Sequence, residues 1–211
     1  MNTDLIIIPL LINLILFAYI KYNYSDYLKL VLFSIINYQA SVLLWKENKN
    51  NKPKSYYLLL VMFFISIGTF MLLLLKDNQS PFISEHFLLI IPILILAIGI
   101  LISFNKVANY ISGKIFLQDE ISSEYNNNIS IFNQSLGIII FPITILITYT
   151  KTAEVFIYLG IVLFVLIYFL KIIRLFKINI SKQLNILYLF LYLCTLEIIP
   201  ILYIVKFLSF I

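Results

Sequence analysis

The stretch VFIYLGIVLFVLIYFL, residues Val155–Leu170, contains sixteen consecutive residues without a charged side chain. The hydrocarbon core of a bilayer, about 30 Å thick, needs roughly 20 mostly apolar residues in a helix. Hydrophobic residues make up 62% of the 211-residue chain, and charged residues only 12%. A soluble domain of this size could not hide so much apolar surface. The sequence therefore predicts an all-α integral membrane protein.

Further apolar runs of similar length predict about six transmembrane helices in one domain. The first four residues lack the positive charge of a signal peptide, so we expect the first run to be a retained span. Gly137 and Pro142 indicate close helix packing and a kink in the fourth span. The predicted spans cover residues 5–20, 56–75, 87–104, 136–149, 155–170 and 184–207.

Residues 28–45 are long enough to span the membrane, but polar residues interrupt them. On a helical projection, Ser34, Asn37 and Ser41 lie roughly opposite an arc of apolar side chains. This asymmetry favours a helix lying in the membrane interface. A seventh span is the alternative interpretation. The apolar arc consists of Leu28, Val31, Leu32, Ile35, Ile36, Val42 and Leu43.

The positive charges predict an orientation, because cytoplasmic loops of membrane proteins carry an excess of Lys and Arg. With six spans, twelve cations fall on one side of the membrane and three on the other. We therefore expect both termini to be periplasmic; a seventh span would move only the N-terminus. The twelve are Lys21, Lys29, Lys46, Lys49, Lys52, Lys54, Lys106, Lys114, Lys171, Arg174, Lys177 and Lys182.

The largest predicted cytoplasmic loop covers roughly residues 105–132. It begins with an amphipathic stretch that runs to Lys114. It ends in the polar run Glu124-Tyr125-Asn126-Asn127-Asn128, which we interpret as a solvated turn.

Glu197 is the one acidic residue deep inside a predicted span. An ionised carboxylate in hydrocarbon is costly, so Glu197 should be neutral or paired. It serves either to handle a proton or ligand, or to bond helices together. Cys194 and Pro200 lie within a turn of it. Counting along the other spans places Asn13, Ser66, Thr69, Pro92, Thr144 and Gly160 at the same depth.

A second polar set is expected at the cytoplasmic ends of the spans. Basic pockets between helices there can bind a phosphate or a lipid headgroup, whereas ordinary charge flanking is the alternative. With one His and one Cys, the chain is expected to hold no Cys/His metal site and no cofactor. The members of this rim set are Asn105, Lys106, Asn133, Gln134, Lys171 and Arg174.

The run LYLFLYLCTLEIIP, residues 187–200, resembles the C-terminal signature of uncharacterised membrane proteins of Gram-negative cell envelopes, domain-of-unknown-function family 4271. Its Cys-Thr-Leu-Glu-x-x-Pro element is the most specific part. The resemblance implies a membrane location and an approximate helix count, and no activity. It favours Glu197, Cys194 and Pro200 as the first residues to test. Further similar positions are Asp4, Trp45-Lys46-Glu47, Asn133-Gln134-Ser135-Leu136-Gly137, Pro142, Tyr149 and Lys206.

Small loops and few catalytic side chains favour a non-enzymatic inner-membrane component, an accessory subunit of a cell-envelope assembly. Its expected partners are the bilayer and other membrane or periplasmic proteins. Nucleic acid is not expected, because the cations lie at span ends. The alternative is a small-solute carrier or proton-coupled transporter that uses Glu197. A third hypothesis, an enzyme acting on lipid-linked substrates at the cytoplasmic rim, lacks an obvious acid–base pair.

Overall fold

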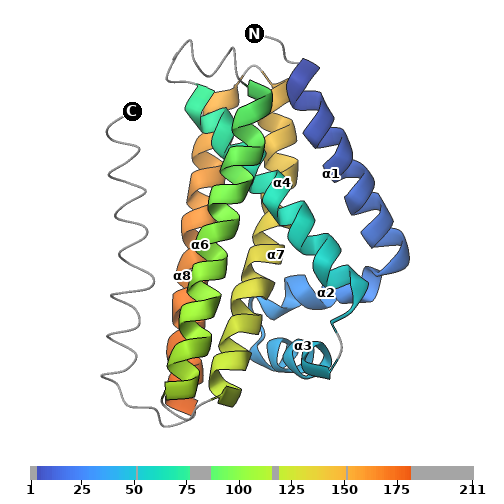
Figure 1. The fold of residues 1–211 in the computed structure, drawn as a ribbon. Coiled ribbons are helices and arrows are strands. Elements are labelled where there is room, and N and C mark those ends of the chain that lie inside the picture. The colour runs from blue at the N-terminus through green and yellow to red at the C-terminus, as the bar shows by residue number, and fades with distance from the viewer. Residues whose placement is uncertain (1–3, 51, 77–86, 116–118, 151, 182–211) are drawn as a thin grey trace.

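The computed structural model describes residues 4–50, 52–76, 87–115, 119–150 and 152–181, which form seven helices and no strand (Figure 1). The predicted all-α fold is therefore confirmed. The helices are α1 (Asp4–Asn23), α2 (Ser25–Ser34), α3 (Tyr38–Asn50), α4 (Lys54–Lys76), α6 (Phe87–Ile115), α7 (Asp119–Tyr149) and α8 (Ala153–Ser181).

Five of the described helices, α1, α4, α6, α7 and α8, are long and apolar enough to cross a membrane. The chain is thus a multi-pass helical membrane protein, as predicted. The sixth predicted span, residues 184–207, lies outside the described residues. The apolar segments are Ile6–Asn23, Lys54–Leu74, Ile90–Ile111, Glu120–Tyr149 and Ala153–Ile178.

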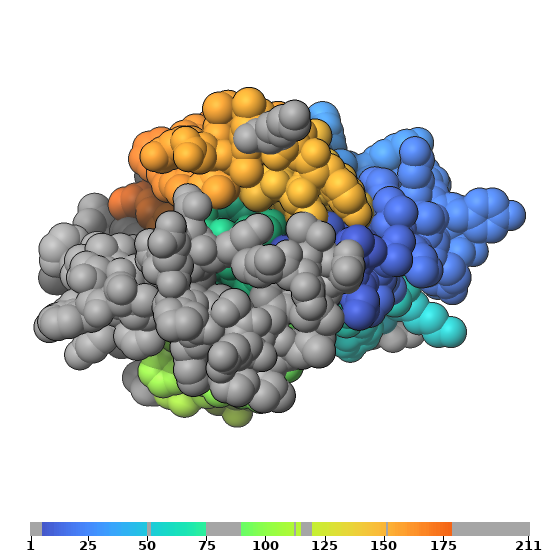
Figure 2. Space-filling view, turned by 90° about the horizontal axis from the view of Figure 1, so that it is seen from above, coloured from blue at the N-terminus to red at the C-terminus, as the bar shows by residue number. Residues whose placement is uncertain are grey.

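The helix α7 is the centre of the bundle, because it packs against each of the other six described helices. More than half of the apolar segments of α4 and α7 is buried, whereas little or nothing of those of α6 and α8 is. The helices α6 and α8 overlap in Figure 1, but they lie on opposite sides in the view from above (Figure 2). A buried pair, α4 and α7, is therefore flanked by outer helices whose apolar side chains are available to lipid.

The two central helices approach each other closely at Gly137 of α7. A Cβ atom built on Gly137 would lie 2.5 Å from the Cα atom of Phe63 in α4. Similarly, a Cβ atom on Gly160 of α8 would lie 2.5 Å from the ring of Phe70. Small residues let membrane helices approach in this way, which confirms the close packing predicted at Gly137.

The single helix predicted for residues 28–45 is wrong, because α2 ends at Ser34 and α3 begins at Tyr38. In the turn between them, the Oδ1 of Asn37 accepts a hydrogen bond of 2.9 Å from the backbone N–H of Gln39. Such local side-chain bonds compete with the backbone pattern of a helix. With 10 and 13 residues, neither α2 nor α3 is long enough to cross a bilayer by itself.

The helices α6, α7 and α8 are longer than their predicted spans. They have 29, 31 and 29 residues, or about 43–47 Å at 1.5 Å per residue. Each continues past its apolar part at the end of the bundle where α2 and α3 lie (Figure 1). The predicted solvated turn at residues 124–128 is wrong, since these residues belong to α7. We call the end of the bundle where α2 and α3 lie the basic end.

A methyl group added at the crossing of α4 and α7 should loosen the bundle. In Gly137→Ala the new Cβ meets the backbone of α4, so the helices must separate; overpacking of this kind costs about 1–3 kcal/mol. We expect a lower midpoint of thermal unfolding in detergent. The matched control is Gly99→Ala on α6, whose Cβ would meet only the ring of Phe64 at 3.9 Å. Equal midpoints for the two variants would contradict this packing.

Candidate functional site

The polar residues in the first half of α7 form a face that is turned toward other helices. Asn127 and Asn128 follow Glu124 by three and four residues, so both lie on the same side of the helix as Glu124, and all three are buried. Buried polar groups are costly unless they are hydrogen-bonded. Between Glu124 and Ser135, the side chains of α7 that bond another helix are Glu124, Asn126, Asn127, Asn128, Ser130, Gln134 and Ser135.

Two asparagines of this face bind side chains of α3. The Nδ2 of Asn48 donates to the Oδ1 of Asn127 at 3.0 Å, and the hydroxyl of Ser41 donates to the Oδ1 of Asn128. All four side chains are buried. Asn48 also donates to the hydroxyl of Tyr27 in α2 at 3.5 Å, and burial raises the pKa of Tyr27 above its ordinary value. Neutral hydrogen bonds thus join α2, α3 and α7.

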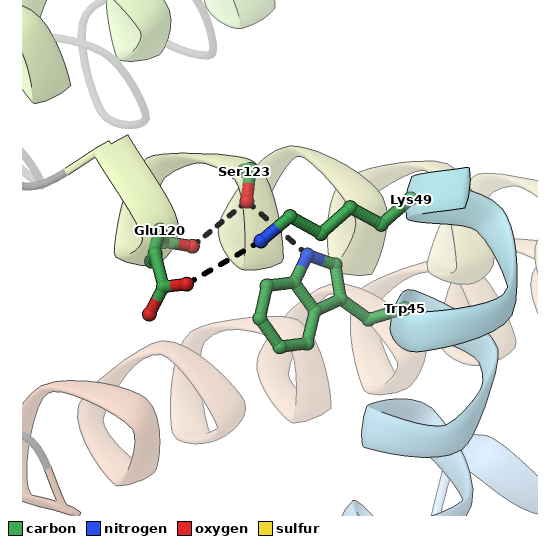
Figure 3. Close-up of polar contacts among 4 residues, drawn as sticks. All are labelled: Trp45, Lys49, Glu120 and Ser123. Atoms are coloured by element: carbon green, nitrogen blue, oxygen red, sulfur yellow. Dashed lines mark hydrogen bonds and ion pairs between the residues drawn. The ribbon is translucent and has the colours of Figure 1, made fainter.

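A second group of contacts joins α3 to the beginning of α7 (Figure 3). The Nε1 of Trp45 donates to the hydroxyl of Ser123 at 3.2 Å, and the Nζ of Lys49 donates to the Oε1 of Glu120 at 3.3 Å. The Lys49 ammonium also lies 5.2 Å from the centre of the Trp45 ring. Exposed ion pairs contribute little, so Trp45 is the more important anchor of this group.

Arg174 of α8 holds the turn between α2 and α3. Its Nη2 donates to the carbonyl oxygens of Ser34 at 2.9 Å and of Ile35 at 3.0 Å. The last carbonyls of a helix have no partner within it, and a cation there complements the helix dipole. The guanidinium also lies 5.5 Å from the centre of the Tyr38 ring, whose hydroxyl donates to the buried Glu124 at 2.8 Å. Arg174 therefore connects α8 with α2, α3 and α7.

The structure brings together two members of the layer predicted around Glu197. The Nδ2 of Asn13 in α1 donates to the hydroxyl of Ser66 in α4 at 2.7 Å, and both side chains are fully buried. Thr69 and Thr144 instead donate to carbonyl oxygens of their own helices. Pro92 is exposed on α6. The remaining candidates of that layer, Glu197, Cys194 and Pro200, lie outside the described residues.

A cavity of about 560 Å³ opens at the basic end between α3, the beginning of α4, α6 and α7. Of the described residues, four lysines and one glutamate line it, and together these five carry a net charge of +3 when all are ionised. Of these lysines, Lys49, Lys52 and Lys114 each lie about 5 Å from the centre of an aromatic ring. The charged lining residues are Lys49, Lys52, Lys106, Lys114 and Glu120.

The residues of the predicted rim set lie in different places. Lys106 lines the basic cavity, whereas Arg174 holds the α2–α3 turn. Gln134 is buried and donates to the backbone of α4 at 3.0 Å. Lys171 lies over an aromatic ring of its own helix. The two remaining members, Asn105 and Asn133, are half-buried on α6 and α7.

The residues that the sequence interpretation missed are those through which α3 docks on α7. In the sequence, Ser41, Trp45 and Asn48 are spaced four and three residues apart, and Asn127, Ser130 and Gln134 are spaced three and four apart. A solvated turn has no reason to show this helical period, so the period was the available signal.

Among the described residues, no group of three His, Cys, Asp or Glu side chains is arranged to hold a metal ion.

Removal of one buried amide should release α3 from α7. In Asn128→Ala the hydroxyl of Ser41 loses its acceptor, and an unpaired buried group costs about 1–3 kcal/mol. We expect amide hydrogen exchange in residues 38–50 to accelerate by about tenfold or more. The exposed Gln39→Ala on the same helix is the control and should leave the exchange rates unchanged. Protection that is identical in the two variants would contradict the docking role of Asn128.

The comparisons with known proteins give a family and no activity. No curated protein and no solved structure is detectably similar to the chain. One family model matches residues 6–208, almost the whole chain, and its description is a domain of unknown function, DUF4271. This match confirms the family resemblance noted in the sequence. The chain therefore belongs to the DUF4271 family of domains of unknown function.

Proposed function

We propose that this protein is a non-enzymatic component of the bacterial inner membrane that supports a larger cell-envelope assembly. The observation that carries this proposal is the use made of the polar residues of α7. Seven of its side chains between Glu124 and Ser135 bond to α2, α3, α4 or α6. Side chains engaged in this way fix helices in place, which is the property required of a scaffold.

The pair α2 and α3 is the part of this scaffold suited to meet a partner. It is held by buried hydrogen bonds to α7 and by Arg174 of α8. On its outer surface, Phe33, Ile36 and Leu43 are 59%, 85% and 58% exposed. Apolar side chains on a rigid support favour contact with a neighbouring membrane protein at the level of the interface.

A small-solute carrier or proton-coupled transporter is the second candidate function, and Asn13 supports it. Among the residues that the structure describes, the Oδ1 of this fully buried side chain has no hydrogen-bond partner, although its Nδ2 is bound to Ser66. Buried acceptors without a partner are rare and call for an explanation. A solute, or the protonated carboxyl of Glu197 at the same predicted depth, would supply the missing donor.

We further propose that the basic end faces the cytoplasm and that the C-terminus is periplasmic. The basic cavity, Arg174 and Lys177 all lie at this end, and cationic segments are retained on the cytoplasmic side.

Reporter fusions test this orientation. Alkaline phosphatase fused after Ile211 should be active, because the enzyme folds only in the periplasm. A fluorescent protein inserted after Ile115, at the basic end, should fluoresce in the cytoplasm. Activity of the phosphatase at Ile115 and its absence at Ile211 would invert the orientation.

Purification of the tagged protein at native expression level, in mild detergent, tests the assembly. We expect a membrane partner to co-purify in stoichiometric amount. Leu43→Glu should release this partner by placing a charge on the apolar surface, whereas the exposed Gln39→Glu on the same helix should retain it.

The two candidate functions differ in their response at Glu197. A scaffold should keep its partner in Glu197→Gln, because the neutral amide still forms hydrogen bonds. A protein that purifies alone, and whose Glu197→Gln variant is folded but loses solute uptake, would favour the carrier and contradict the assembly.

A further inference from the structure

A shallow apolar groove of about 570 Å³ lies between α4 and α6. Its α6 wall includes Leu96, Gly99, Ser103 and Val107, which are spaced three and four residues apart and therefore lie on one side of the helix. Phe64 forms the α4 wall. Gly99 gives the groove its depth, because even a Cβ atom there would come no closer than 3.9 Å to Phe64.

The α6 residues that line the groove and those that line the basic cavity lie on one side of the helix. Ser103 and Val107 line the groove, and Tyr110 and Lys114 line the cavity. These four residues follow one another at intervals of four, three and four, so they form one stripe that changes from apolar to basic. From Leu96 to Val107 the groove extends for about 16 Å along the helix, at 1.5 Å per residue. This length accommodates most of an acyl chain.

The lining of the cavity is suited to a phosphate group. Lysines from α3, from the connection to α4 and from α6 point their charges at one space, with Glu120 as the one carboxylate among the lining residues described. The repulsion among these positive charges decreases when an anion binds between them. Asn127 lines the same cavity and is 9% exposed, and its Nδ2 donor has no partner within the described part of the chain. The volume exceeds that of a single phosphate and falls within the range of about 300–1,000 Å³ for ligand sites.

From this arrangement we infer that the protein binds an anionic phospholipid, with the phosphodiester headgroup in the basic cavity and one acyl chain in the α4–α6 groove. The basic cavity matches the anionic headgroup, and the apolar groove matches the acyl chain. The cavity and the groove also follow one another along α6 as the headgroup and the chain do in the lipid. A lipid seated here contacts α3, α4, α6 and α7 together, so its binding also stabilises the basic end. The inference stands independently of the proposed partner protein, because it rests only on residues of this chain.

Native mass spectrometry of the full chain tests the site. The delipidated protein is titrated with phosphatidylglycerol and, separately, with phosphatidylcholine of identical acyl chains. We expect phosphatidylglycerol to bind at least about tenfold more tightly, since the anionic headgroup alone differs. Lys106→Gln with Lys114→Gln should weaken that binding about tenfold or more. The control pair Lys21→Gln with Lys29→Gln removes the same charge from exposed positions on α1 and α2, and should have no effect.

Gly99→Leu tests the acyl-chain half, because its side chain fills the groove while the cavity keeps its charges. We expect it to weaken the binding of both lipids. Equal affinity for the two lipids, or no change in the Lys106/Lys114 variant, would overturn the proposal. So would full competition by inorganic phosphate together with no effect of Gly99→Leu, which would indicate a site for soluble phosphate. A dimer abolished by Gly99→Leu would assign the groove to a second copy of the chain.

Thermal unfolding of the unmodified protein keeps the proposal testable if the variants do not fold. A ligand that binds only the folded state raises the unfolding midpoint. Phosphatidylglycerol should therefore raise the midpoint more than phosphatidylcholine at the same concentration. Equal shifts would contradict a site selective for the anionic headgroup.

Discussion

Polar side chains on α7 lie among helices where water cannot reach most of them, and each needs a hydrogen-bond partner supplied by the protein. This constraint organises the basic end. Asn127 and Asn128 fix the position of α3, and Ser130 and Gln134 fix the beginning of α4 through Tyr56. Apolar packing alone would permit the helices to slide along one another, because lipid is as apolar as their surfaces. Directional bonds remove that freedom, so the position of α2, α3 and α4 depends on them.

The sequence predicted the five long apolar helices that the structure describes, because the length and composition of an apolar run are local properties. It failed at residues 28–45 and 124–128 for a shared physical reason. Serine and asparagine favour turns when their side chains bond nearby backbone, as Asn37 does. The same residue types support a helix when another element supplies the partners, as α3 does for Asn127. The sequence shows the polar groups but not the partners, and the partners decide between turn and helix.

The sequence predicted the candidate sites less completely than the apolar helices. Depth along a span follows from counting residues, and this was sufficient to associate Asn13 with Ser66. It was insufficient for Thr69 and Thr144, because depth does not fix the rotation of a helix, and a threonine hydroxyl can bond its own helix. The rim set shows the same limit: Lys106 and Arg174 lie at one end of the bundle but meet different neighbours. A count of charges predicts the end of the bundle at which a cation lies, but not the neighbours that its side chain meets there.

The two kinds of polar residue at the basic end have different consequences for what the protein can bind. Asparagine and serine both donate and accept, so they satisfy one another, and Asn48, Asn127, Ser41 and Asn128 form such pairs within the protein. Lysine only donates and carries a charge that a neutral acceptor cannot neutralise. Glu120 pairs with Lys49 in an exposed contact, and the described lining of the cavity holds more lysines than carboxylates. The amides and hydroxyls therefore hold the helices, and the surplus of lysines directs the cavity toward an anion that comes from outside the chain.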